Sequence, residues 1–99
     1  MHELSLADGI LRVLEQTRAR EPFERITQLR LEVGALAGVE IEALRFALDS
    51  IAAGTLLAWA SIEIDQPPGD AWCPPCGQSV AITSRLDACP LCGGYQLQP

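Results

Sequence analysis

Four cysteines near the end of the chain are the residues whose type and spacing predict chemistry most directly. They form two Cys-x-x-Cys pairs, and the chain has no other cysteine. Two residues between cysteines let one tight turn point both thiolates at a single atom, and a second such turn supplies two more ligands. Gly77 and Gly93 follow the pairs directly, where a turn around a metal–sulfur pair needs backbone at positive φ. The spacing predicts a tetrahedral four-thiolate site, with zinc as the expected metal. The four predicted ligands are Cys73, Cys76, Cys89 and Cys92.

Other uses of four cysteines fit their surroundings less well. Two disulfides are possible by number, but two matched pairs on a chain without a secretory signal favour a metal. A redox Cys-x-x-Cys pair normally follows a strand and opens a helix, whereas the prolines and glycines around these pairs indicate knuckle turns. Iron stays open as the metal, because spacing alone does not separate it from zinc. Four protein thiolates leave no open coordination position, so we expect a structural site rather than a catalytic one.

The start of the chain carries its only histidine, His2. The free amine of Met1, the next two backbone nitrogens and the imidazole can surround a metal ion in a plane, which suits Ni(II) or Cu(II) rather than zinc. Glu3 adds a carboxylate as an axial or neighbouring group. The amine and any amide ligand must lose a proton, so metal binding there should weaken in acid. The competing interpretation is that Met1 to Glu3 form a solvated tail.

Composition narrows the range of functions. The net charge is −6 without a cluster of basic residues, which argues against nucleic acid as a partner. The longest apolar stretch, Ile51 to Ala60, is short and contains Gly54, so we expect no membrane span. No basic and apolar leader opens the chain, so we expect a cytoplasmic protein. We also expect no enzyme, because the sequence has no Ser/His/Asp set, no second histidine and no phosphate-binding loop.

Hydrophobic periodicity predicts two helices and two strands before the cysteines. The first helix is expected over residues 5–19, with Ser5 as its N-cap and Asp8 as the capping-box partner. A strand is expected over residues 25–33, where apolar and charged side chains alternate. A second helix begins near Glu40 and ends at Gly54, and a second strand covers residues 61–65. The apolar stripe of the second helix is Ile41, Leu44, Leu48 and Ile51.

This order of elements predicts an α+β fold, with two helices on a small mixed β-sheet followed by a zinc-ribbon module. We expect parallel strands with a right-handed connection, because the segment between them is long enough for a crossover. Residues 1–68 form the first predicted domain and residues 69–99 the second, with Pro67-Pro68-Gly69 as the linker. Short ribbon strands are expected at 80–83 and 95–97. Trp59 and Trp72 are expected to pack at the two ends of the second strand.

Three separate segments resemble the HypA/HybF family of hydrogenase maturation proteins. They are the opening Met1-His2-Glu3-Leu4-Ser5-Leu6, the stretch from Leu31 through Phe46, and the two knuckles with their glycines. The resemblance implies a nickel metallochaperone that binds nickel with Met1, His2 and Glu3 and holds a structural zinc with the four cysteines. It also implies that the chain works with a HypB-type nickel GTPase and delivers nickel to the large subunit of [NiFe] hydrogenase. Some members of the family serve urease.

One feature departs from the pattern of that family. Its members continue past the second knuckle with a strand that returns to the sheet of the nickel lobe, whereas this sequence stops at Pro99. Two strands make a marginal sheet, and a missing third strand leaves an open edge. Either the sequence is shortened, or a neighbouring chain or a partner covers the edge, and we expect reduced stability or self-association through it. The competing function is a zinc-ribbon interaction module without a transported metal, which would have no need of a free N-terminus.

Overall fold

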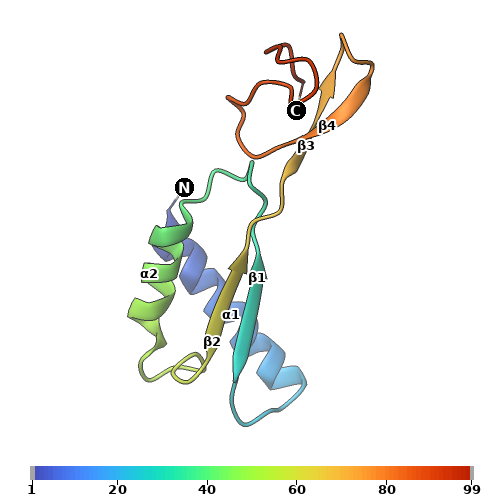
Figure 1. Cartoon of the computed structure of the whole chain (residues 1–99). Coiled ribbons are helices and arrows are strands. Elements are labelled where there is room, and N and C mark those ends of the chain that lie inside the picture. Colours follow the sequence, from blue (N-terminus) through green and yellow to red (C-terminus); the bar gives the residue numbers. More distant parts are fainter. Residues whose placement is uncertain (1, 99) are drawn as a thin grey trace. The chain divides into compact units, whose positions relative to one another are not determined.

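The computed structural model describes residues 2–98, and over that range the chain forms two helices and four strands (Figure 1). In chain order the elements are α1 (Glu3–Arg20), β1 (Gln28–Glu32), α2 (Ile41–Ala52), β2 (Ser61–Asp65), β3 (Gly69–Cys73) and β4 (Gln78–Ile82). The chain divides into two compact units. The first contains the residues up to Leu31 together with Val39–Ile64, and the second contains Glu32–Gly38 together with the residues from Asp65 onward. The predicted α+β class is confirmed.

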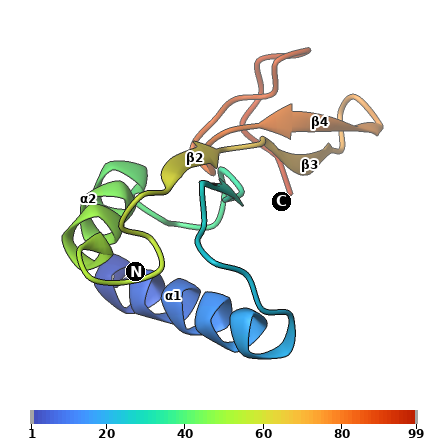
Figure 2. The same cartoon turned by 90° about the horizontal axis from the view of Figure 1, so that it is seen from below.

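The first unit is built around the contact between α1 and α2, which lie side by side (Figure 2). On α2 the buried side chains are Leu44, Ala47 and Leu48, and the last two follow Leu44 by three and four residues, as expected for one face of a helix. Ala7 is the fully buried residue of α1, and its small side chain allows the two helices to approach closely. The predicted stripe of α2 is therefore confirmed at its two central leucines.

Helix α1 begins earlier than its sequence pattern suggested. Its N-cap is His2, in an extended conformation (φ −86°, ψ 94°), and no side chain caps it. The first backbone bond runs from the Leu6 N–H to the His2 carbonyl oxygen at 3.1 Å. The prediction of Ser5 as N-cap and Asp8 as its partner is therefore wrong, because Ser5 already lies inside the helix. Glu3 lies in the first turn, where its negative charge interacts favourably with the positive end of the helix dipole. This interaction stabilises the start of α1 in place of a side-chain cap.

Strands β1 and β2 pair in parallel. The Ser61 N–H donates to the Thr27 carbonyl where both strands begin, and the Val33 N–H donates to the Asp65 carbonyl where both end, with bonds of 2.9 and 2.8 Å. The predicted parallel pairing follows directly from these two bonds. Exposure alternates along β1 as expected, with exposed residues on either side of a half-buried Leu29. Over residues 2–98 this sheet consists of the two strands alone.

The second unit is a small antiparallel hairpin with a correspondingly small core. Strands β3 and β4 pair from Gly69 opposite Ile82 to Cys73 opposite Gln78. The linker expected at 67–69 is thus partly wrong, since Gly69 already opens a strand. The strand expected at 95–97 does not form. In the part of the chain that the structure describes, this end pairs only through a single bridge between Trp72 and Gln98. The buried cluster of this unit is Ala71, Cys73, Val80, Ile82 and Cys89.

The two tryptophans do not pack as predicted. Trp59 is 79% exposed in the turns between α2 and β2, and Trp72 is 45% exposed. The reason for Trp72 is the alternation of a strand, which turns its side chain away from the buried neighbours Ala71 and Cys73. Over the described part of the chain, no helix is both long enough and apolar enough to cross a bilayer.

The Leu44→Ala substitution tests the helix–helix core. We expect it to lower the free energy of unfolding by about 2–5 kcal/mol, because it removes a fully buried side chain and leaves a cavity. The matched control is Leu4→Ala on α1, where the same side chain is 57% exposed and the expected loss is below about 1 kcal/mol. Urea unfolding followed by circular dichroism at the helix band measures both. Equal losses would contradict this description of the core.

Candidate metal centre

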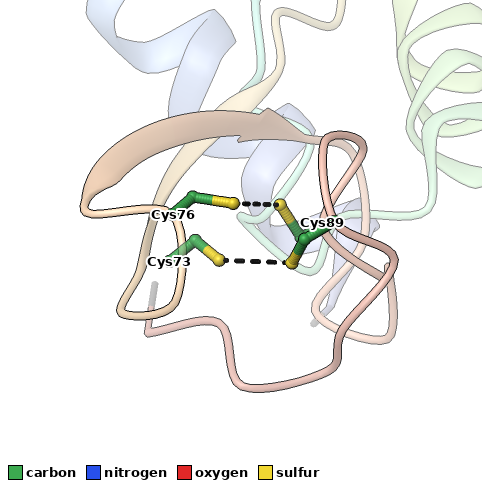
Figure 3. A group of neighbouring side chains, drawn as sticks. Cys73, Cys76 and Cys89 are labelled. Atoms are coloured by element: carbon green, nitrogen blue, oxygen red, sulfur yellow. Dashed lines mark hydrogen bonds between the residues drawn. The ribbon is translucent and has the colours of Figure 1, made fainter.

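The structure brings the four cysteine side chains together, as the sequence predicted. Their sulfur atoms all lie within 4.8 Å of one another. The Sγ atoms of Cys76 and Cys89 are 3.9 Å apart (Figure 3). Those of Cys73 and Cys92 are 3.7 Å apart. Zinc–sulfur bonds of about 2.3 Å in a tetrahedron place two sulfurs about 3.8 Å apart, so the cluster fits zinc. A disulfide requires about 2.05 Å, and all four cysteines are free, so these distances do not describe two disulfides.

Each pair of cysteines is held by the same turn. In the first knuckle the Gly77 N–H donates to the Cys73 carbonyl at 2.8 Å, and in the second the Gly93 N–H donates to the Cys89 carbonyl at 2.8 Å. Both glycines have positive φ, 64° and 75° respectively. An L side chain at either position would strain the turn, which is why glycine directly follows each pair. The predicted conformation of both glycines is confirmed.

The thiols of the cluster differ in acidity because their surroundings differ. The backbone N–H of Cys92, followed by that of Leu91, lowers the pKa of Cys89 to about 7. The Leu91 N–H lies 3.4 Å from the Cys89 sulfur. By contrast, the neighbouring thiol of Cys73 does most to raise the pKa of Cys76 to about 12. Backbone dipoles therefore favour one thiolate, while a bound cation must supply the attraction that keeps four of them together.

The loop between the knuckles is closed by Asp87, which sequence reasoning missed. Its Oδ2 atom accepts hydrogen bonds from the Thr83 N–H at 2.9 Å, the Thr83 hydroxyl at 3.2 Å and the Ser84 N–H at 3.2 Å. The Thr83 N–H in particular holds the pKa of Asp87 below its usual value. A Thr-Ser pair followed by an aspartate within one turn is a recognisable loop signal in the sequence. The turn ends two residues before Cys89 and so fixes where the second knuckle starts.

The predicted nickel ligands lie at the start of α1. Met1 is outside the described residues, while His2 is exposed at the N-cap. The Glu3 carboxylate accepts a hydrogen bond from the Glu40 N–H at 3.2 Å, at the beginning of α2. That bond is the main reason why the pKa of Glu3 is lowered. The side chain of Glu3 thus ties the start of α1 to the start of α2, and the nickel ligand set itself remains a prediction.

A helical α+β unit combined with a four-cysteine knuckle cluster defines a metal-binding protein, and comparison with known proteins shows its family. The family described as "Hydrogenase/urease nickel incorporation, metallochaperone, hypA" matches residues 1–99. The chain therefore belongs to the HypA family of nickel metallochaperones.

Individual relatives agree with this assignment. The chain is 59% identical over 99 residues to the hydrogenase maturation factor HypA of Cupriavidus necator, covering 100% of this chain and 83% of the relative. It is 57% identical to the HypA of Polaromonas naphthalenivorans, covering 86% of that relative. Among solved structures, the solution structure of the Ni metallochaperone HypA from Helicobacter pylori matches with a TM-score of 0.64 at 15% identity, covering 98% of this chain and 85% of that chain. At this identity the match shows the fold.

The Asp87→Ala substitution tests the loop that positions the second knuckle. We expect metal to leave the purified protein faster in the presence of a chromogenic chelator, because three donors in the loop lose their common acceptor. Asp87→Asn keeps one acceptor oxygen and should lie between wild type and alanine. Asp70→Ala, an exposed carboxylate on β3, serves as the control. Release of metal at the wild-type rate from Asp87→Ala would show that the loop does not hold the knuckle.

Proposed function

We propose that this chain carries Ni(II) at its free N-terminus and delivers it to the large subunit of [NiFe] hydrogenase during maturation. The observation that supports this most strongly is the position of His2 at the open start of α1, in a chain of the HypA family. The first N–H groups of a helix have no partner within the helix. The backbone nitrogens of His2 and Glu3 can therefore bind a metal without breaking a helical hydrogen bond.

The helix dipole disfavours a cation at this site unless negative charge offsets it. The N-terminus of a helix carries partial positive charge, which opposes a cation. Deprotonated amide nitrogens offset that charge, and the ionised Glu3 carboxylate adds negative charge beside them. Since the carboxylate is held by the Glu40 N–H, we propose that Glu3 contributes its backbone nitrogen to nickel and uses its side chain to fix the start of α1.

For the cysteine cluster we propose structural Zn(II). Four thiolates complete the coordination of zinc and leave no position for water or substrate, so the protein acts as a carrier and not as an enzyme. When bound, the metal supplies the positive charge that holds the knuckles together. Cys73 and Cys76 would hold it from the first knuckle, and Cys89 and Cys92 from the second.

We further propose a functional division into a nickel-binding lobe, residues 1–68, and a zinc module, residues 69–99. The two compact units differ from it, because Glu32–Gly38 and residues 65–68 belong to the cysteine-bearing unit. The proposed partners are a HypB-type nickel GTPase and the hydrogenase large subunit, in the cytoplasm, with urease as an alternative client. The family description names hydrogenase and urease, and so supports these two as the clients.

The two-stranded β1–β2 sheet supports a proposal of self-association through its edge. A sheet of two strands is marginal by itself, and over residues 2–98 no third strand pairs with it. Sedimentation equilibrium at increasing protein concentration tests the proposal. We expect the mean mass to rise above that of the monomer, and a mass that stays at the monomer value would refute it.

A nickel titration tests the carrier function against the alternative, a zinc-ribbon interaction module without a transported metal. Protein with its native N-terminus is compared with protein extended by two residues before Met1 and with His2→Ala, all loaded with zinc first. We expect the native protein to bind one equivalent of nickel and both variants to lose it while retaining zinc. Affinity should fall as the pH falls, because protons compete for the amine and the amide nitrogens.

Ser5→Ala is the control for this titration, because Ser5 is exposed one turn further along the helix and supplies no proposed ligand. Equal nickel binding by all proteins would place the site elsewhere. Absence of binding by the native protein would favour the interaction module.

A further inference from the structure

We propose that a groove beside His2 binds an apolar side chain of the protein that exchanges nickel with this chain, and that this side chain sits in a positively charged segment. The inference rests on the proposed function only in placing nickel at the N-terminus. The groove lies entirely within the first unit, between the start of α1 and one face of α2, and has a volume of about 580 Å³.

Two large apolar side chains flank the groove, and small ones form its floor. Phe46 on α2 is 75% exposed, and Leu4 on α1 is 57% exposed. Ala43 and Ala47 line the space between them. A single exposed apolar residue is ordinary on a protein surface, but two of them facing one hollow make a surface that water solvates poorly. Aromatic side chains such as that of Phe46 are enriched in protein–protein interfaces, where their burial contributes to binding.

The position of the groove connects it to nickel transfer. His2 and Glu3 line the same hollow as Leu4 and Phe46. A partner whose apolar side chain enters the groove therefore places the neighbouring residues of its segment next to the proposed nickel ligands. Docking and metal exchange then share one surface, which shortens the path over which the ion must pass.

The charges around the groove indicate what kind of segment it accepts. Glu42 and Asp49 stand four residues before and three residues after Phe46, so both are its neighbours on the surface of α2. Asp8 stands four residues after Leu4 on α1 in the same way. All three are exposed carboxylates, and Glu3 adds a fourth at the groove itself. An apolar centre within an acidic surround is complementary to an apolar side chain among arginines and lysines.

The basic residue nearest to Phe46 in sequence does not neutralise this surround. Arg45 directs its guanidinium to the carbonyl oxygen of Ile62 on β2, at 2.9 Å. A second copy of this chain is a poor occupant, because the same acidic surface would face itself. The occupant to which the charges point is a different protein with a basic segment.

Trp59 provides an internal comparison. It is as exposed as Phe46, at 79%, and it also belongs to the first unit. It lines another hollow, however, whose charged residues have both signs: Arg18 and Arg25 with Glu15 and Glu24. An exposed aromatic residue is therefore not enough to define the proposed surface. The acidic surround and the contact with His2 distinguish the groove at Phe46.

The test measures binding of a purified HypB-type GTPase to the nickel-loaded chain by calorimetry, at low and at high salt. We expect Phe46→Ser to weaken binding by about tenfold or more, and Glu42→Lys with Asp49→Lys to weaken it as well. Trp59→Ser, the matched control, should bind within about twofold of wild type. Higher salt should weaken the wild-type complex, because opposite charges attract across the interface.

Three results would overturn the proposal: equal binding by wild type and Phe46→Ser, equal loss in Phe46→Ser and Trp59→Ser, or no measurable binding by the wild-type chain. A nickel titration of Phe46→Ser separates this test from that of the carrier function. If Phe46→Ser binds nickel normally but does not bind the GTPase, both proposals stand. If the wild type binds no nickel, the carrier function fails and with it the role of the groove in exchange, even where docking depends on Phe46.

Discussion

The convergence of four sulfur atoms is the constraint on which the second unit depends. Its buried cluster has five members, and two of them are the cysteines Cys73 and Cys89. So small a core buries little apolar surface, and a domain of this size normally needs a metal or disulfides for stability. The pairing of β3 with β4, the matched knuckle turns and the Asp87 loop together place the four sulfurs within 4.8 Å of one another, with two of the pairs at 3.7 and 3.9 Å. In this account the bound metal holds the unit together through that geometry.

The proposed nickel site at the N-terminus differs from the cysteine cluster in both ligand type and coordination geometry. The proposed nickel ligands are nitrogens of the main chain and an imidazole, which form a plane, while the cysteine cluster offers soft sulfur in a tetrahedron. Ligand type and geometry can therefore direct two divalent ions to two places in one chain. In the first unit, the packed helices and the bond between Glu3 and Glu40 hold the start of α1, where the nickel site is proposed. The same two helices form the groove beside His2. The proposed nickel site and the proposed partner site are therefore both positioned by the packing of α1 against α2.

Much of this arrangement could be predicted because it depends on local pattern. Short-range sequence patterns were enough to predict the spacing of the cysteines around a metal, the glycines that follow them and the leucine stripe of α2. Strand β2 was predicted with its observed bounds, Ser61–Asp65. The failures have physical reasons as well. Ser5 suited a cap, but the chain becomes helical two residues earlier, where Glu3 is bonded to a backbone group 37 positions away. A pattern of neighbouring residues cannot predict a contact over this distance in sequence. It also cannot tell whether Trp59 is exposed or buried.

Two metal sites with different ligands are expected in this chain, and X-ray absorption at the zinc and nickel edges of one sample tests this directly. For the doubly loaded protein we expect four sulfurs around zinc at about 2.3 Å. Around nickel we expect only nitrogen and oxygen, in a planar arrangement. Cysteine thiolate sulfur in the nickel shell, or nitrogen in the zinc shell, would contradict two separate sites.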